Sequence, residues 1–547
     1  MAHRLARIVW AALVGSLIGT GTLTAQQPSE QVTNQDLLDG LKQPTKWLTF
    51  SGDYSGRRHS PLTQITPENV NRLVTQWTFQ SDNTGKFEAT AIVLDGVLYV
   101  TGANNLAWAL DARSGRQIWK YVRDLPEGVV VCCGRVNRGF GILGDTLFMA
   151  TLDAHLIALD RRTGTVLWDT VIEDYKKAYS STSAPLVVKG QVIIGMGGGE
   201  YGVRGFIDAY DAATGKRTWR FHTIPAPGEK GSETWPRGTD GWQTGGGATW
   251  MSGSYDPELN LLYWGTGNAG PQMFGDDREG DNLYAASLVA LDADTGTLRW
   301  HYQFTPHDVW DYDATHVPVL ADVVINGQSR KVLMNANRNG FFYVLDRVTG
   351  KFILGKPFVK TTWASEITAD GRPRILTNTN PNEKGATVCP ATAGGTNFMT
   401  PAYNPTLGLF FVTAREGCMT YYAWKVDYVP GESFRGGAGV ASTTDPTYGA
   451  LRAIDPVTGE RRWEFRYASP TSAGVTSTAS GLVFAGDSEG NFMAFDGRTG
   501  QDLWHYQMGG PVFASANTYM LDGRQYVLIP AGTTLTAFAL ADFNRPR

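Results

Sequence analysis

"ALDARSGRQIW", residues 109–119, is the stretch that decides the fold, because it recurs along the whole chain. The five other intact copies are "ALDRRTGTVLW" (158–168), "AYDAATGKRTW" (209–219), "ALDADTGTLRW" (290–300), "AIDPVTGERRW" (453–463) and "AFDGRTGQDLW" (494–504). A degenerate copy, "VLDRVTGKFIL" (344–354), has Leu354 in the tryptophan position. In every intact copy the Asp precedes the Trp by eight residues, which indicates a repeated structural unit.

Each copy is typical of a β-hairpin. An apolar strand ends at the Asp, the following residues up to the Gly form a turn, and a second strand carries the Trp. Spacings of about 40–55 residues between most copies are typical of four-stranded propeller blades. Trp77 opens the series, and "YNPTLGLFFVT" (403–413) echoes "YDPELNLLYWGTG" (255–267), which predicts an untagged blade between Leu354 and Trp463. We therefore expect an all-β, eight-bladed β-propeller whose tryptophan tags pack between blades.

The start of the chain predicts export. Residues 1–27, "MAHRLARIVWAALVGSLIGTGTLTAQQ", have a basic start, a short apolar stretch broken by glycines and a small-residue exit near Ala25. This layout predicts a signal peptide over 1–25, a single propeller domain over 26–547 and a periplasmic location, with no membrane span. A net charge of -4 without a basic block gives no reason to expect a nucleic-acid partner.

The chain has four cysteines, and two of them, Cys132 and Cys133, are adjacent. Consecutive Cα atoms lie about 3.8 Å apart, whereas disulfides prefer roughly 5.5–6 Å. Three pairings with Cys389 and Cys418 are open from the sequence alone. No C-x-x-C-H motif occurs, so the sequence excludes a covalently attached c-type haem.

Five features follow one another in a fixed order: the adjacent cysteines, "GGGEYGVRG" (197–205), "GGGATW" (245–250), "WGTGN" (264–268) and "HDVWDYD" (307–313). Together with the tagged repeats they resemble the quinoprotein alcohol dehydrogenases, the methanol and ethanol dehydrogenase family that uses pyrroloquinoline quinone (PQQ). The resemblance runs from about residue 45 to the C-terminus. Each motif alone is weak, and the ordered set is specific.

The resemblance implies a cofactor site. A Cys132–Cys133 disulfide is expected against one face of the quinone and Trp250 against the other, a suitable clamp for a planar ring system. Arg138 is expected to bind a cofactor carboxylate, and Arg338 to stabilise charge at the reactive carbonyl. The remaining implied contacts are Glu88, Thr182, Gly198, Gly199, Thr249 and Asn397.

The resemblance also implies a metal ion held by Glu200, Asn268 and Asp311, which are hard oxygen donors. No His or Cys cluster in the sequence suggests zinc. Asp313 departs from the calcium-dependent pattern and matches members that use a lanthanide, since a trivalent ion favours more oxygen ligands and negative charge. We expect one lanthanide ion, with Ca²⁺ as the alternative.

Asp311 is expected to be the catalytic base, with Arg338 as the second catalytic residue; Asp308 and His307 lie nearby and rank second. Family members often place a second tryptophan near the cofactor, and this chain has Ser472 at about that place. Cys389 and Cys418 match the spacing of the family's second disulfide, which is expected to staple the untagged blade.

The implied function is a periplasmic dehydrogenase that oxidises primary alcohols, or the derived aldehydes, by hydride transfer to PQQ. Electrons then pass to a separate, soluble cytochrome c, and a homodimer is a further expectation. The alternative is a non-catalytic propeller scaffold for outer-membrane or cell-envelope protein assembly. A scaffold shares the tagged repeats but needs none of the adjacent cysteines, Arg138, Glu200, Asn268 or Asp311.

Overall fold

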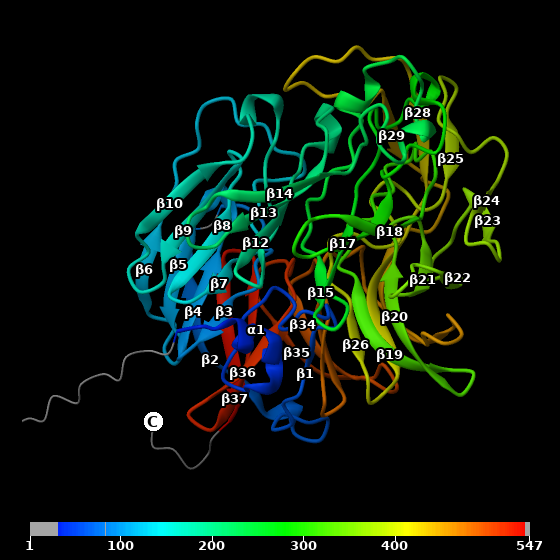
Figure 1. The fold of residues 1–547 in the computed structure, drawn as a ribbon. Helices are drawn as coiled ribbons and strands as arrows, with labels where there is room; N and C mark the ends of the chain where they lie inside the picture. The colour runs from blue at the N-terminus through cyan, green and yellow to red at the C-terminus, as the bar shows by residue number, and fades with distance from the viewer. Residues whose placement is uncertain (1–30, 83, 542–547) are drawn as a thin grey trace, which may run out of the picture. The chain divides into compact units, whose positions relative to one another are not determined.

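The computed structural model describes residues 31–82 and 84–541, and these residues form an almost entirely β structure (Figure 1). The chain divides into Met1–Glu30 and Gln31–Arg547, and the predicted signal peptide lies outside the described residues. The described part has one α-helix, α1 (Asn34–Asp39), whose N-cap Thr33 forms a capping box with Asp36. Its 3₁₀ helices are η1 (Gly40–Lys42), η2 (Val70–Arg72), η3 (Ala103–Asn105), η4 (Tyr175–Lys177), η5 (Gly199–Tyr201), η6 (Ser232–Thr234), η7 (Gly241–Thr244) and η8 (Asp276–Arg278).

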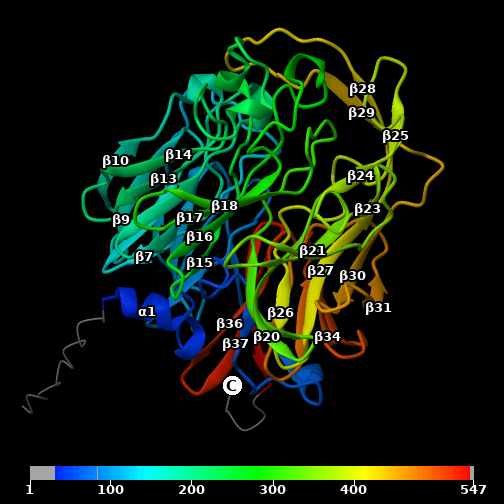
Figure 2. The ribbon, with the colours of Figure 1, turned by 45° about the vertical axis from the view of Figure 1, so that its right-hand side comes forward.

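Most of the described strands belong to antiparallel sheets of four strands that follow one another along the chain (Figures 1 and 2). The first two sheets consist of β3 (Ile92–Leu94), β4 (Val97–Thr101), β5 (Ala107–Asp111) and β6 (Gln117–Tyr121), and of β7 (Gly141–Leu143), β8 (Thr146–Ala150), β9 (His155–Asp160) and β10 (Val166–Val171). The third and fourth consist of β11 (Leu186–Val188), β12 (Gln191–Gly195), β13 (Phe206–Asp211) and β14 (Arg217–His222), and of β15 (Ser254–Asp256), β16 (Leu261–Gly265), β17 (Ser287–Asp292) and β18 (Leu298–Gln303). The fifth consists of β19 (Val319–Ile325), β20 (Gln328–Ala336), β21 (Phe341–Asp346) and β22 (Phe352–Pro357).

The last three of these sheets close the structure, because two of them take strands from the N-terminal part of the domain. They are β26 (Ala402–Asn404), β27 (Leu409–Glu416), β30 (Tyr448–Ile454) and β31 (Arg461–Arg466); β32 (Thr476–Thr478), β33 (Leu482–Gly486), β34 (Asn491–Asp496) and β35 (Asp502–Gln507), joined by β1 (His59–Ser60); and β36 (Asn517–Leu521), β37 (Arg524–Ala531) and β38 (Thr534–Leu540), joined by β2 (Leu73–Gln80). β1 pairs in parallel with β32, and β2 pairs antiparallel with β38. The result is an all-β propeller.

The repeated sequence fixes the register of the outermost strand pair in each of the seven sheets that contain a copy of it. The first residue of each copy lies directly opposite the last residue of that copy across the strand pair: Ala109 pairs with Trp119, and Ala158 with Trp168. The degenerate copy has the same register, with Val344 opposite Leu354. A small residue opposite the indole leaves room for the large ring to lie across the strand pair.

Six of the tryptophan rings lie against the turn of the following sheet. The Trp119 indole Nε1 donates to the Arg161 carbonyl at 2.9 Å, and a Cβ at Gly164 would lie 2.8 Å from the Trp119 ring. Gly164 has φ of 73°, so both the backbone conformation and the close ring favour glycine at this turn position. The same arrangement links Trp77 to Gly115 and Trp463 to Gly500.

The prediction of an untagged blade between Leu354 and Trp463 is wrong. Residues 403–413 contribute to β26 and β27, which pair with β30 and β31 in the sheet that carries Trp463. The intervening chain instead forms two small sheets, β23 (Ala364–Ile367) with β24 (Pro373–Ile375), and β25 (Ala386–Val388) with β28 (Met419–Ala423) and β29 (Gly437–Ala441). The Cys389–Cys418 disulfide joins the end of β25 to the start of β28, so it ties together an insertion and not a blade.

Within the described part of the chain, no helix is both long enough and apolar enough to cross a membrane.

Candidate active site

A cavity of about 310 Å³ lies among loops that leave one end of the sheets. In an antiparallel four-stranded sheet the connections after the second and fourth strands leave from the same end. Glu200 and Arg338 follow second strands (β12 and β20), whereas Cys132, Trp250 and Asp311 follow fourth strands (β6, β14 and β18). This topology brings residues more than 200 positions apart to one cavity.

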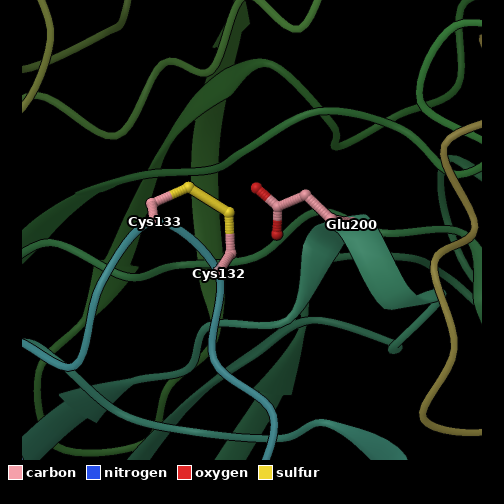
Figure 3. Close-up of side chains that lie close together, drawn as sticks. All are labelled: Cys132, Cys133 and Glu200. Carbon is pink, nitrogen blue, oxygen red and sulfur yellow. A yellow bond between two sulfur atoms is a disulfide. The ribbon is translucent and has the colours of Figure 1, made fainter. Parts of the chain in front are cut away.

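The adjacent cysteines form a disulfide that lines the cavity, with their Cα atoms 3.8 Å apart. The other disulfide is the expected Cys389–Cys418 pair, so no described cysteine is free. The Glu200 carboxylate points toward the Cys132–Cys133 bond, as Figure 3 shows, and one oxygen and the two sulfur atoms lie within 4.8 Å of one another. The sulfur pair therefore presents a polarizable wall beside an acidic group.

Trp250 lines the cavity and is held by polar contacts. Its indole Nε1 donates to Asp313 Oδ2 at 3.0 Å, and the Arg138 guanidinium carbon lies 5.2 Å from the centre of the Trp250 ring. The indole is thus positioned by an acceptor and a cation.

Arg138 is the centre of a buried polar network. Its Nη2 lies 2.7 Å from Glu88 Oε2, and its Nη1 donates to Thr182 Oγ1 at 2.7 Å. Burial raises the pKa of the Glu88 carboxyl, and the neighbouring Arg138 charge opposes that rise. The structure therefore brings together three residues that the resemblance assigned to the cofactor.

Arg338 lies between two carboxylates. Its Nη2 donates to Asp311 Oδ2 and its Nη1 to Asp313 Oδ2, each at 2.7 Å, and its Nε donates to the Thr392 carbonyl at 2.8 Å. All three side chains are buried and line the cavity. The guanidinium is thereby fixed in one orientation, with both aspartates as its partners.

The cluster contains more carboxylate charge than the single positive charge of Arg338 can neutralise. Burial raises the pKa of Asp311 well above its usual range; the Arg338 charge opposes the rise, and the Asp313 and Glu200 charges add to it. Burial and the Asp313 charge likewise raise the pKa of Glu200, which forms no ion pair within residues 31–82 and 84–541. Asp311 Oδ1 is buried without a hydrogen-bond partner in the described part of the chain. Unpaired buried oxygens of this kind fit a hard metal cation.

Asn268 lies next to this cluster but does not line the cavity. Its backbone N–H donates to Asp313 Oδ1 at 2.6 Å, and its side-chain Nδ2 donates to the Ala269 carbonyl at 2.9 Å. The amide oxygen therefore faces the η5 turn: a Cβ at Gly199 would lie 3.0 Å from Asn268 Oδ1.

The structure brings most of the remaining expected residues to the cavity, but not all. Gly198 and Asn397 line it, and the Asn397 side chain bonds the Ala393 carbonyl at 3.1 Å. Gly199 and Thr249 do not line it. The Thr249 hydroxyl is fully buried and lies 2.5 Å from the Phe206 carbonyl and 2.9 Å from the Met196 N–H, so it joins backbone segments.

Asp308 and His307, ranked second as bases, are outside the cavity lining. The Asp308 carboxylate accepts from the backbone N–H groups of Trp310 at 3.1 Å and Tyr312 at 2.9 Å, which shapes the loop that presents Asp311. His307 Nδ1 lies 2.8 Å from the Gly280 carbonyl.

Several residues of the cavity wall were missed in the sequence. They are single side chains without a motif: Lys86, Gln272, Met273, Phe398, Arg415 and Arg435. Arg435 shows why, because its Nη2 lies 3.9 Å from Cys132 Sγ across 303 residues of sequence. Only the closure of the sheets brings such groups together.

The chemistry of the cavity fits a flat, polyanionic quinone. A disulfide and an indole offer surfaces for a planar ring, and several basic side chains line the same space. Glu200, Asp311 and Asp313 provide oxygen donors for a cation beside it.

Comparisons with known proteins agree with this class. The family profile described as "Glucose/ethanol/alcohol dehydrogenase, beta-propeller domain" matches residues 47–361 and 433–527. The chain is 38% identical to the quinoprotein alcohol dehydrogenase PedH of Pseudomonas putida, over 94% of this chain and 91% of that protein. It is 36% identical to the lanthanide-dependent methanol dehydrogenase of Methylacidiphilum fumariolicum strain SolV, over 91% and 86%.

A solved structure described as a europium-containing methanol dehydrogenase superposes with a TM-score of 0.87 at 33% identity, covering 92% of this chain and 100% of that one. The chain therefore belongs to the family of PQQ-dependent alcohol dehydrogenases.

Proposed function

We propose that this chain oxidises primary alcohols, or the aldehydes derived from them, with PQQ as the hydride acceptor and one lanthanide ion as the metal. The observation that carries the proposal is the Arg338 fork on Asp311 and Asp313, beside the unpartnered Asp311 Oδ1. A non-catalytic scaffold has no use for such a cluster, because uncompensated buried carboxylates destabilise a fold.

The Asp311 Oδ1 atom is the proposed acceptor of the alcohol hydroxyl proton. Asp311 Oδ2 is already bonded to Arg338, so Oδ1 is the oxygen that the carboxylate can offer to the metal ion and to the substrate hydroxyl. Arg338 keeps this orientation through its third contact, to the Thr392 carbonyl.

The cofactor would be held by Arg138, Glu88 and Thr182 at one part of the cavity and by Asn397 and the backbone of Gly198 at others. The Cys132–Cys133 disulfide and Trp250 would cover its faces. When bound, the quinone supplies an electrophilic carbonyl and the metal ion supplies Lewis acidity.

Glu200, Asn268, Asp311 and Asp313 are the proposed metal ligands. Asp313 supports the trivalent ion because its carboxylate adds charge beside Glu200 and Asp311, and Ca²⁺ is the alternative. Its two oxygens bond Arg338, Trp250 and the Asn268 N–H, so metal binding would exchange some of these contacts.

Further elements of the proposal concern the whole protein. The eight sheets of four or five strands found in residues 31–82 and 84–541 would be eight blades, seven of them tagged by tryptophan. Residues 1–25 would direct export to the periplasm, where electrons would pass to a soluble cytochrome c.

The test is reconstitution of purified apoprotein with PQQ and either La³⁺ or Ca²⁺, followed by alcohol-dependent reduction of a dye. We expect turnover of primary alcohols with La³⁺, less with Ca²⁺, and none in a chelator-treated sample without added metal. Absence of turnover with both metals across a panel of primary alcohols and aldehydes would contradict the proposal.

A further inference from the structure

Arg415 is a cavity residue that the proposed mechanism does not use. It lies near the end of β27, where its backbone N–H donates to the Gly395 carbonyl at 2.8 Å. Its Nε donates to the Thr471 carbonyl at 2.8 Å, and its Nη2 is hydrogen-bonded to Ser472 Oγ. The half-buried guanidinium is thus anchored by the segment that precedes β32, and both Arg415 and Ser472 line the cavity.

The charge of Arg415 has no counter-ion among residues 31–82 and 84–541. Arg138 lies 2.7 Å from Glu88, and Arg338 bonds Asp311 and Asp313, whereas Arg415 forms no ion pair with any carboxylate of the described chain. Burial and the nearby Arg338 charge lower the pKa of Arg415 to about 10. A cation placed in a cavity without a counter-ion is unfavourable unless a ligand supplies one.

Two donors of this pair remain available. Arg415 Nη1 has no hydrogen-bond partner in the described part of the chain, and Ser472 Oγ already accepts from Nη2, which leaves its O–H free to donate. A guanidinium and a hydroxyl side by side match the two oxygens of a carboxylate.

We propose that Arg415 and Ser472 form a carboxylate-binding site of this cavity, separate from the one at Arg138. The inference rests on the proposed function, which brings a tricarboxylate cofactor into the cavity. A carboxylate of the quinone is the expected occupant, and a carboxylate of the substrate is the other source of the same chemistry. In either case Ser472 suits this role, because a large indole at this position has no hydroxyl to share with Arg415.

The first measurement is the affinity of apoprotein for PQQ, followed by quenching of tryptophan fluorescence. We expect Arg415→Gln to weaken binding by about 10- to 100-fold, the range for a charge-assisted hydrogen bond, and Arg415→Lys and Ser472→Ala to weaken it less. The trimethyl ester of PQQ, which lacks the charges, should bind wild type and Arg415→Gln equally.

Arg204→Gln is the matched control. Arg204 is also half-buried, its pKa is also lowered by burial, and its Nε also donates to a backbone carbonyl, that of Ile224 at 2.8 Å, but it lies outside the cavity lining. This variant should bind PQQ with unchanged affinity.

The second measurement separates the two sources. The ratio of kcat/KM for an ω-hydroxycarboxylate to that for the unsubstituted alcohol of equal chain length is compared in wild type and Arg415→Gln. A ratio lowered about 10-fold or more, with unchanged PQQ affinity, assigns the site to a substrate carboxylate. If folded Arg415→Gln and Ser472→Ala both show an unchanged PQQ affinity and an unchanged kcat/KM ratio, the inference of a carboxylate-binding site is overturned, while the proposed function is unaffected. A wild-type apoprotein that binds no PQQ would overturn the proposed function as well.

Discussion

The two ends of the sheets use the same residue types, aspartate and tryptophan, with opposite results. At the tagged turns, Asp160 Oδ1 accepts from the backbone N–H of Arg162 at 3.0 Å and from the backbone and hydroxyl of Thr163, each at 2.9 Å. Trp119 donates to the neighbouring turn and packs on its glycine. At the cavity, one oxygen of Asp311 has no partner among the residues that the structure describes, and Trp250 bonds the Asp313 carboxylate, which Arg338 and the Asn268 N–H also bond.

This difference separates stability from function. Polar groups that are satisfied by their own turn add to the stability of the fold and have no capacity left for a ligand. Carboxylates that share one arginine in a buried cavity reduce stability, and they gain a partner when a cation or substrate binds. Changes at the cavity should therefore alter chemistry, and changes at the turns should alter unfolding.

The largest effect is expected from Asp311→Asn. Loss of the proposed base should lower kcat by about 10²–10⁴-fold, because the amide cannot take the hydroxyl proton. PQQ absorbance and affinity should be retained, since the variant conserves shape. Steady-state kinetics of the reconstituted variant measure this.

Asp308→Asn is its matched control. Asp308 is also buried in the same loop but bonds only backbone N–H groups, and burial raises its pKa to about 6. We expect a lower melting temperature with kcat within about tenfold of wild type. A larger fall in kcat for Asp308→Asn than for Asp311→Asn would reverse the assignment.

The converse experiment is Trp119→Ala. Removal of a buried indole that bonds the Arg161 carbonyl should cost about 3–5 kcal/mol of unfolding free energy. The PQQ affinity and kcat of the folded fraction should stay near wild type, because the turn lies at the other end of the sheet from the cavity. Denaturant unfolding measures the change, and Trp424→Ala, whose side chain is 47% exposed, should cost less than about 0.5 kcal/mol.

Asp313→Ala tests the metal selectivity of the cavity. Without this carboxylate, lanthanide affinity should fall by roughly 100-fold, and Ca²⁺ should be affected less because a divalent ion needs fewer charges. Terbium luminescence excited through tryptophan measures the first, and competition by Ca²⁺ the second. An equal loss of affinity for the lanthanide and for Ca²⁺ would show that Asp313 acts by positioning Arg338 and Trp250, and not by adding negative charge next to the metal ion.

The sequence predicted the sheets well because a repeat reports local geometry. The Asp-to-Trp spacing defines a hairpin, and the strand register follows it, with Ala109 opposite Trp119. The error at residues 403–413 arose where β28 and β29 interrupt a sheet between its second and third strands, so that sequence spacing no longer measured a blade.

The cavity was predictable only where short motifs, such as the adjacent cysteines and "HDVWDYD", marked it. The motif "GGGATW" predicted both Trp250 and Thr249; Trp250 lines the cavity, whereas the Thr249 side chain faces the backbone of β13. Arg415 had no such marker, since one arginine on a strand carries no spacing signal. The proposed role of Arg415 depends on its hydrogen bond to Ser472, which lies 57 residues away in the sequence and contacts Arg415 only in the folded protein.

The smallest effect concerns a titratable group outside the cavity. His59 in β1 lies 2.9 Å from Ser477 Oγ through Nδ1, and burial lowers its pKa from 6.5 to about 4, with the Arg57 charge as a second cause. Between pH 6.5 and 4 the unfolded chain binds a proton that the folded chain does not, so this group makes stability fall as pH falls through that window. From pH 7.5 to 5.5 the loss of unfolding free energy should be about 1 kcal/mol.

Denaturant unfolding at both pH values should show that His59→Gln removes this part of the pH dependence while kcat stays unchanged at each pH. A pH dependence identical in His59→Gln and wild type would show that the pKa of His59 is the same in the folded and the unfolded protein, which would contradict the lowering by burial.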